Sequence, residues 1–269
     1  MNIVTISRAT LAGTSKLSDL LSEELSLPVI KRETVIEAAE KYHIKETGFC
    51  DIAFVERAPS IWERQFYRRK HYLLSFQSTL LDLVSNGSCI YVGHLGGYLL
   101  TEIPFVLRIR VVQSEETRIK NRKIEQNISF AQAEIDIKLI DERRRQWSEF
   151  LYNVNHEDPK FYDLVINLDV MSLHSAVELI RTALKMPEFN SNPESLQIFK
   201  NLQLSSKVKL FLYLSPVTRG IEVDIDTDEH NGEVFIKGIS NTMDTDKYES
   251  YIKNVLSKLP EIRKIYFQI

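Results

Sequence analysis

Residues 7–16, with the sequence SRATLAGTSK, carry the side chains of a loop that could hold a phosphate group. They follow a β-prone run and precede a strongly helical segment. The first backbone N–H groups of a helix have no partner inside the helix, so an anion is stabilised there. The full G-x-x-x-x-G-K-[ST] pattern is absent, and an ordinary turn between a strand and a helix stays open as the alternative. The candidate phosphate-binding residues are Ser7, Arg8, Gly13, Thr14, Ser15 and Lys16.

A charge-rich helical region at residues 113–154 supplies arginines, whose planar forks match phosphate oxygens. This charged, largely polar region could move as a lid over an anion held by the loop. Two of the arginines lie four residues apart and would share one helical face. A solvated face with salt bridges is the alternative interpretation. The lid candidates are Arg118, Arg122, Arg143 and Arg145.

Short, mainly apolar runs alternate with amphipathic segments over the first part of the chain. The runs at residues 3–7, 89–92 and 105–112 are typical of buried parallel strands. Residues 16–27 have leucines at helical spacing, and residues 61–85 show the same pattern over a longer helix. Strands separated by helices predict an α/β fold with a parallel sheet that helices cover on both faces.

The last part of the chain has a different pattern. PEFNSNPES near residue 190 has the composition of a linker. Asn231-Gly232 lies between two alternating runs and predicts an antiparallel hairpin with a type I′ turn, because both residues tolerate positive φ. A helix is expected over residues 246–259. We therefore predict a first domain at 1–188, a linker or helix at 189–204 and a small α+β domain at 205–269.

Composition limits the classes of partner. The formal charge is −3, from 34 basic and 37 acidic residues, so the sequence gives no reason to expect nucleic acid as a partner. No apolar run approaches the length of a membrane span, and the start of the chain has no leader-like pattern, so we expect a cytoplasmic protein. Cys50 and Cys89 lack the spacing of paired metal ligands, which predicts reduced structural thiols and no metal site.

Several blocks occur in an order that resembles the cytidylate kinase-like family, a branch of the P-loop nucleoside monophosphate kinases. They include VTISRATLAGTSK, CIYVGHLGGYLL and ISFAQAEIDIKLIDERRRQW, and the resemblance extends from residue 1 to about 185. The family usually shows TISREYGSGG, then an Asp-Lys, then a Gly-Arg. Bulkier residues in the first block would limit the approach of backbone to phosphate. The departures are Leu11 and Thr14 for loop glycines, Lys31-Arg32 for Asp-Lys and Gly93-His94 for Gly-Arg.

The resemblance implies a P-loop NTPase-type fold and phosphoryl transfer from ATP, with Mg²⁺, to a pyrimidine nucleoside monophosphate. Asp141 and Arg144 match the family's Asp-x-x-Arg lid pattern and are the catalytic candidates. The acceptor-side candidates are Arg32, Gly93 and His94. Two alternatives stay open: a catalytically weak or inactive nucleotide-sensing module with a degraded loop, and a scaffold with a vestigial pocket.

Residues 205–269 resemble a BON domain, a small α+β module associated in other proteins with phospholipid or partner binding. The resemblance rests on GIEVDIDTDEHNGEVFIKGIS, the helix after it and the final run KIYFQI. The hairpin is acidic, which disfavours attraction to anionic membranes. A protein partner or self-association is therefore the expectation for this domain.

Overall fold

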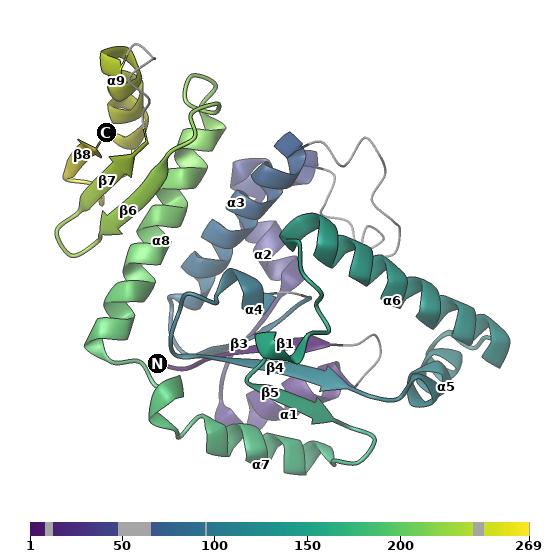
Figure 1. Cartoon of the computed structure of the whole chain (residues 1–269). Helices are drawn as coiled ribbons and strands as arrows, with labels where there is room; N and C mark the ends of the chain where they lie inside the picture. Colours follow the sequence, from purple (N-terminus) through teal and green to yellow (C-terminus); the bar gives the residue numbers. More distant parts are fainter. Residues whose placement is uncertain (9–12, 48–65, 95, 239–244, 269) are drawn as a thin grey trace.

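A five-stranded parallel sheet forms the centre of the first unit in the computed structural model, which describes residues 1–8, 13–47, 66–94, 96–238 and 245–268. The strand order is β2-β3-β1-β4-β5, and every neighbouring pair is parallel. Figure 1 shows the strands ending on the side where α5 and α6 lie. The strands are β1 Ile3–Arg8, β2 Val29–Lys31, β3 Cys89–Val92, β4 Val106–Val112 and β5 Leu164–Asn167.

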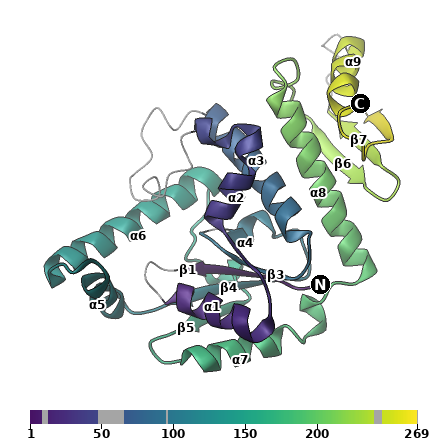
Figure 2. The ribbon, with the colours of Figure 1, turned by 180° about the vertical axis from the view of Figure 1, so that it is seen from behind.

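Helices cover both faces of this sheet, as the sequence predicts (Figures 1 and 2). On one face lie α1 (Thr14–Leu25) and α7 (Leu173–Ala183). The helices α5 and α6 form a hairpin beyond the carboxyl ends of the strands. The remaining helices of this unit are α2 Arg32–Ala38, α3 Phe66–Val84, α4 Gly96–Leu99, α5 Glu115–Gln126, α6 Phe130–Tyr152, and the short 3₁₀ turns Glu40–Tyr42, Ile44–Thr47, Pro159–Phe161 and Pro187–Phe189.

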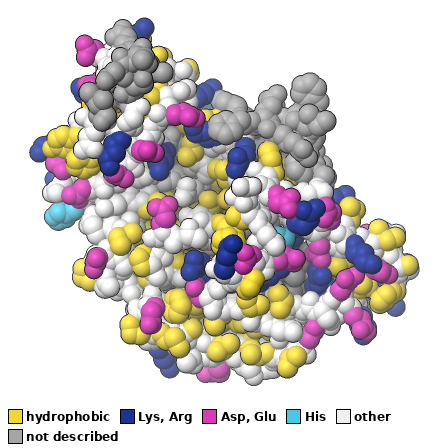
Figure 3. Space-filling model, in the orientation of Figure 1, with side chains coloured by type: hydrophobic (Ala, Val, Ile, Leu, Met, Phe, Trp, Pro, Cys, Tyr) yellow, Lys and Arg dark blue, Asp and Glu magenta, His cyan; other side chains and the backbone are white. Residues whose placement is uncertain are grey.

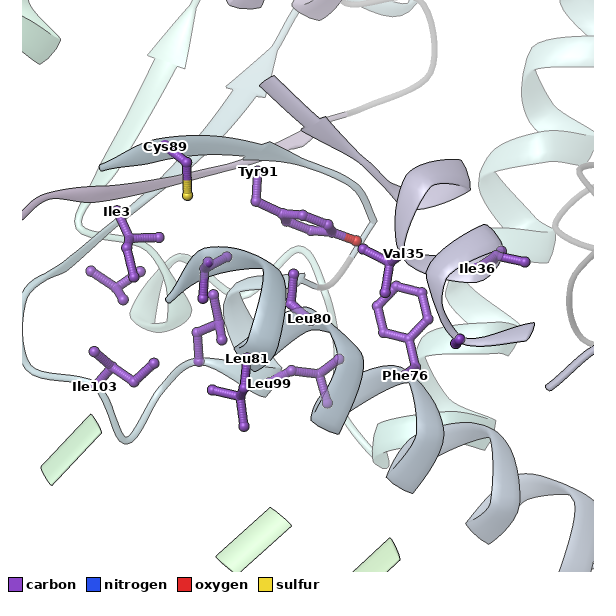
Figure 4. Close-up of a cluster of buried hydrophobic side chains, with 14 of the residues drawn as sticks. Ile3, Val35, Ile36, Phe76, Leu80, Leu81, Cys89, Tyr91, Leu99 and Ile103 are labelled. Atoms are coloured by element: carbon purple, nitrogen blue, oxygen red, sulfur yellow. The ribbon is translucent and has the colours of Figure 1, made fainter. Parts of the chain in front are cut away.

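Successive side chains of a strand point to opposite faces of the sheet, so the buried side chains form two clusters, one on each face. In β1, Val4 and Ile6 face α1 and α7, whereas Ile3 faces the cluster under α2, α3 and α4. All three side chains are fully buried. Figure 4 shows the cluster under α2, α3 and α4. In it, the ring of Tyr91 in β3 extends between the sheet and α2. Burial on both faces explains why these strands are mainly apolar rather than alternating.

The buried ring of Tyr91 leaves no room for a side chain at Gly96, so a substitution there tests the described packing. A Cβ atom built at Gly96 would lie 1.8 Å from Cε1 of Tyr91, which is fully buried. We expect Gly96→Ala to lower the free energy of unfolding by about 2–3 kcal/mol, because overpacking a filled core forces its neighbours to move. Chemical denaturation measures this change.

Gly220→Ala is the matched control, since no atom lies within 4 Å of the added Cβ. It should change the free energy of unfolding by less than about 0.5 kcal/mol. Equal stabilities for Gly96→Ala and the wild type would contradict the described packing of Tyr91.

A continuous helix, α8 (Pro193–Leu214), joins the two parts of the chain. Asn192 caps it in a reciprocal capping box with Ser195. Phe199, in its first half, packs in the core beneath α3, whereas Val208 and Leu212, in its second half, pack against the C-terminal sheet. The segment that we expected as a linker or helix is therefore largely the first half of α8, and the division at residues 188 and 205 stays a prediction.

The C-terminal unit is α+β, as predicted, with the mixed sheet β6-β7-β8. Strands β6 (Asp224–Asp228) and β7 (Glu233–Lys237) form the expected antiparallel hairpin, and β8 (Lys264–Gln268) runs parallel to β7. The turn type differs from the prediction, because Gly232 has φ 65° but Asn231 is not among the residues with positive φ. Residues 229–232 form a longer loop, in which the Asn231 side chain donates to Asp228. The helix α9 spans Thr245–Leu256.

Within the residues that the structure describes, no helix is both long enough and apolar enough to cross a bilayer.

Candidate functional site

The carboxyl end of β1 is the topological switch point of the sheet. From β1 the chain first builds β2 and β3 on one side, and then β4 and β5 on the other. Ligands of open α/β sheets bind in the crevice at such a point. The chain enters α1 from this end, which places the predicted phosphate loop there.

Gly13 shapes the start of α1. It is the N-cap residue with φ 72° and ψ 8°, a left-handed conformation that glycine adopts without strain. Gly13 has no side chain to cap this end, and the first turn holds no acidic residue, which favours an anion at the backbone N–H groups there. Ser15 and Lys16 are exposed in the same turn. Residues 9–12, including Leu11, and the side chains of Arg8 and Thr14 lie outside what the structure describes.

A buried polar group, which the sequence did not predict as part of the site, lies beside this loop. Arg110 of β4 pairs in register with Ser7 of β1, and it is only 5% exposed. Its Nη1 donates to the carbonyl oxygen of His156 at 2.7 Å, and its Nη2 contacts a carboxylate oxygen of Glu157 at 2.9 Å. The hydroxyl of Tyr162 donates to the same His156 oxygen at 2.7 Å and lies 3.4 Å from the Ser7 hydroxyl.

His94 connects the carboxyl end of β3 to α6. Its Nε2 lies 3.0 Å from the hydroxyl of Ser148, and that hydroxyl donates to the carbonyl oxygen of Arg144 at 2.7 Å. Because the Ser148 proton is used in this way, Nε2 of His94 must be the donor. His94 Nδ1 has no hydrogen-bond partner among the described residues. This pattern is that of a neutral imidazole.

The lowered pKa of His94 also favours a neutral imidazole. Burial, the charge of Arg144 and the neighbouring His156 hold the pKa of His94 well below its usual range. The two imidazole rings pack edge to face, with their centroids 4.8 Å apart. Burial first, and then Arg110 and Arg144, lower the pKa of His156 to about 4. At neutral pH, His94 is therefore uncharged, and it would bring no positive charge to the predicted acceptor side.

Both histidines couple stability to pH. In the unfolded chain each binds a proton near its ordinary pKa of 6.5, whereas the folded protein excludes that proton until the pH is much lower. We therefore expect the free energy of unfolding to fall as pH is lowered from about 6.5 to about 4, by about 3 kcal/mol for His156. Urea denaturation across this range measures the slope.

His156→Gln and His94→Gln should flatten this slope. His230→Gln, at an exposed position on the hairpin loop, should leave it unchanged. An unaltered slope in both buried-site variants would contradict the neutral state of the two imidazoles.

The arginines of the α5–α6 hairpin differ in their contacts. Arg118, only 8% exposed, donates from Nη1 to both carboxylate oxygens of Asp141 at 2.7 and 2.9 Å. Arg122 contacts Asp136 at 3.2 Å. Arg145 forms exposed ion pairs with two glutamates of its own helix. Figure 3 shows both signs of charge mixed over this hairpin.

Arg143 is half-buried and makes no ion pair with any residue that the structure describes. The charge of Arg144 reaches both buried histidines, since it contributes to lowering the pKa of each. The Arg144 carbonyl oxygen accepts from Ser148, whose hydroxyl contacts His94, so Arg144 lies near the carboxyl edge of the sheet. Arg118, Arg122 and Arg145 form ion pairs within the hairpin.

The other acceptor-side candidates lie at the carboxyl ends of β2 and β3. Arg32 is the first residue of α2, directly after β2. Gly93 follows β3, and a Cβ atom there would lie 2.2 Å from the Tyr91 hydroxyl oxygen. Packing of Tyr91 thus gives a structural reason for glycine at 93, separate from any ligand contact.

Metal-ligating residues are not grouped at this site. Across the described residues, no group of three or more His, Cys, Asp or Glu side chains could hold a metal ion. Mg²⁺ commonly keeps several waters and binds through substrate phosphates with one or two protein ligands.

Comparisons with known proteins identify relatives of the first unit. The chain is 24% identical over 186 residues to a cytidylate kinase of Methanobrevibacter smithii, which covers 68% of this chain and 99% of that protein. An uncharacterized protein from Eubacterium ventriosum has a similar fold, with a TM-score of 0.52 and 16% identity, covering 68% of this chain and 97% of the other. A shikimate kinase from Bacteroides thetaiotaomicron aligns with a TM-score of 0.42 and 13% identity, over 69% and 99%. The family model of the cytidylate kinase-like family matches residues 3–170, and the chain belongs to that family.

Proposed function

We propose that this protein is a nucleoside monophosphate kinase that transfers a phosphoryl group from ATP to a pyrimidine nucleoside monophosphate. The observation that carries the proposal is the uncapped N-terminus of α1, which follows Gly13 at the switch point of the sheet. Family membership supports the reaction class, and the cytidylate kinase of Methanobrevibacter smithii supports a pyrimidine acceptor.

Each element of the site has a distinct part in this proposal. The first N–H groups of α1 and the exposed Lys16 hold the donor phosphates, as helix N-termini do in anion sites. Bound Mg²⁺ would neutralise charge on those phosphates, with no dedicated carboxylate cage among the described residues to hold it. Arg144 stabilises charge on the migrating group, and Asp141 fixes Arg118 at the base of the hairpin. The neutral His94 orients the segment after β3.

We further propose the domain division at residues 188 and 205 and a BON-like role for the C-terminal unit, through which a protein partner or a second copy of this chain binds. The cytoplasmic location stays a prediction from the sequence.

A regulatory module that senses a nucleotide without turning it over is the second candidate. The observation that favours it is the pairing of Arg118, Arg122 and Arg145 with carboxylates, which leaves fewer cations for the phosphoryl group. The two functions differ in turnover and share nucleotide binding.

The test is Mg-ATP binding to the full chain by calorimetry, followed by ADP release with CMP, dCMP and UMP. ATP binding with release of ADP that depends on one acceptor supports the kinase. Binding without turnover supports the sensing module, and absence of binding at millimolar ATP rejects both. Leu11→Gly with Thr14→Gly should raise ATP affinity, because glycine permits closer approach of backbone to phosphate.

A further inference from the structure

A cavity of about 420 Å³ lies away from the nucleotide site, where the C-terminal unit meets α3. Lys70 and Leu74 of α3 form one wall. The end of α8, with Leu212 and Tyr213, the segment between α8 and β6, and residues of β6 and β7 form the others. The views in Figures 1 and 2 place α8 between α3 and the C-terminal sheet. Cavities of this size hold small organic molecules and occur preferentially where two units meet.

The lining combines an apolar body with a cationic excess. Leu74, Ile221 and Val223 supply apolar surface, and four lysine and arginine side chains face two carboxylates. Those cations are Lys70, Lys209, Arg219 and Lys237. The two carboxylates, Glu222 and Asp224, are exposed, so a ligand can displace them into water at little cost.

Arg219 is held in place by three contacts. Its Nε donates to the carbonyl oxygen of Tyr213 at 3.0 Å, and its Nη2 to that of Leu214 at 3.2 Å. Its guanidinium carbon also lies 5.7 Å from the centre of the Tyr213 ring. The ammonium nitrogen of Lys70 lies 5.8 Å from the centre of the same ring. Two cations are thus fixed on one aromatic wall of the cavity, which lowers the entropy cost of binding an anion there.

Lys209 is the cation that α8 contributes to the lining of the cavity. It is exposed and makes no ion pair with any described residue, so its charge is available to a ligand. Lys237, in contrast, pairs with Asp226 of the neighbouring strand.

We propose that this cavity binds a small aromatic monoanion, such as an aryl carboxylate or sulfonate. Its ring lies against the apolar lining near Val223, and its acid group lies between Lys209 and Arg219. The site is separate from the nucleotide site and does not depend on the proposed kinase activity. Because its walls come from α3 and from the C-terminal unit, the bound ligand ties the two parts of the chain together.

The test uses 8-anilinonaphthalene-1-sulfonate, an aromatic sulfonate whose fluorescence rises in apolar surroundings, titrated into the full chain with excess Mg-ATP present. We expect saturable binding at one site per chain. Lys209→Glu should weaken it at least tenfold, and Val223→Trp should abolish it by filling the cavity. Lys258→Glu, the same charge change at an exposed lysine of this unit outside the cavity, should bind as the wild type does.

Competition separates anion recognition from simple apolar binding. Naphthalene-1-sulfonate should displace the probe, and neutral 1-naphthol should do so at least tenfold less well. Equal affinity in wild type and folded Lys209→Glu, persistent binding in Val223→Trp, displacement by ATP, or equal competition by the two naphthalenes would each overturn the proposal. Circular dichroism of each variant establishes that it is folded.

Discussion

Gly13→Val is expected to weaken ATP binding by at least about tenfold. Gly13 has φ 72°, and a left-handed conformation costs an ordinary L-residue about 1–2 kcal/mol, with more for a β-branched side chain. Its added atoms would also crowd the Leu168 side chain, which lies 3.2 Å from the site of a Cβ atom. Relief of this strain turns the start of α1 and misaligns the N–H groups that would face the phosphates. Calorimetric titration with Mg-ATP measures the loss.

Gly13→Asn is the matched control for this prediction. Asparagine tolerates the left-handed region because its short polar side chain bonds locally, so most of the ATP affinity should remain. Thermal unfolding of both variants separates a local effect from a global one. If Gly13→Val binds ATP as tightly as Gly13→Asn does, the N-terminus of α1 is not the phosphate site.

The α/β fold of the first unit is predictable because its signal is local. Runs such as residues 89–92 are short and apolar, and the leucines of α1 have clear helical spacing, so each element type follows from its own residues. The second half of α8 is harder, because VKLFLYL, residues 208–214, is apolar except for Lys209. Val208 and Leu212 pack against the C-terminal sheet and the Tyr213 ring lies against His71 of α3, so apolar side chains point in several directions and the helical period is hard to recognise.

The buried polar part of the site depends on strand order, which the sequence does not give. Ser7 and Arg110 become neighbours only because β1 pairs with β4. One local signal was present: Arg108 and Arg110 alternate in the strand VLRIRVV, although a strand buried on both faces should be apolar. Arg108 pairs with Asp163, and Arg110 reaches the backbone of His156. Two arginines within an otherwise apolar strand were therefore a local signal for a polar site, and this signal did not require the strand order.

Arg144→Ala is expected to lower kcat for ADP formation by on the order of 10²–10³-fold, the loss typical of removing one donor aimed at the transition state. Arg144 lies near the carboxyl edge of the sheet, because its carbonyl oxygen accepts from the Ser148 hydroxyl, which in turn contacts His94 after β3. An arginine needed mainly in the transition state changes kcat much more than the affinity for ATP. Steady-state ADP release with the preferred acceptor, compared with calorimetric ATP affinity, measures both effects.

Two controls distinguish catalysis from structure. Arg145→Ala removes a neighbouring arginine whose ion pairs with Glu142 and Glu149 are exposed. Such pairs contribute at most about 1 kcal/mol to stability, so the variant should stay folded and its kcat should change less than about fivefold. Arg144→Lys keeps the charge but loses the planar fork, and should recover only part of the rate. A structural role for Arg144 predicts instead a lower melting temperature with unchanged kcat in the folded fraction. That result would remove Arg144 from the reaction and favour the sensing module. Arg118, Arg122 and Arg145 are held by carboxylates and would have to break these contacts before they could stabilise a phosphoryl group.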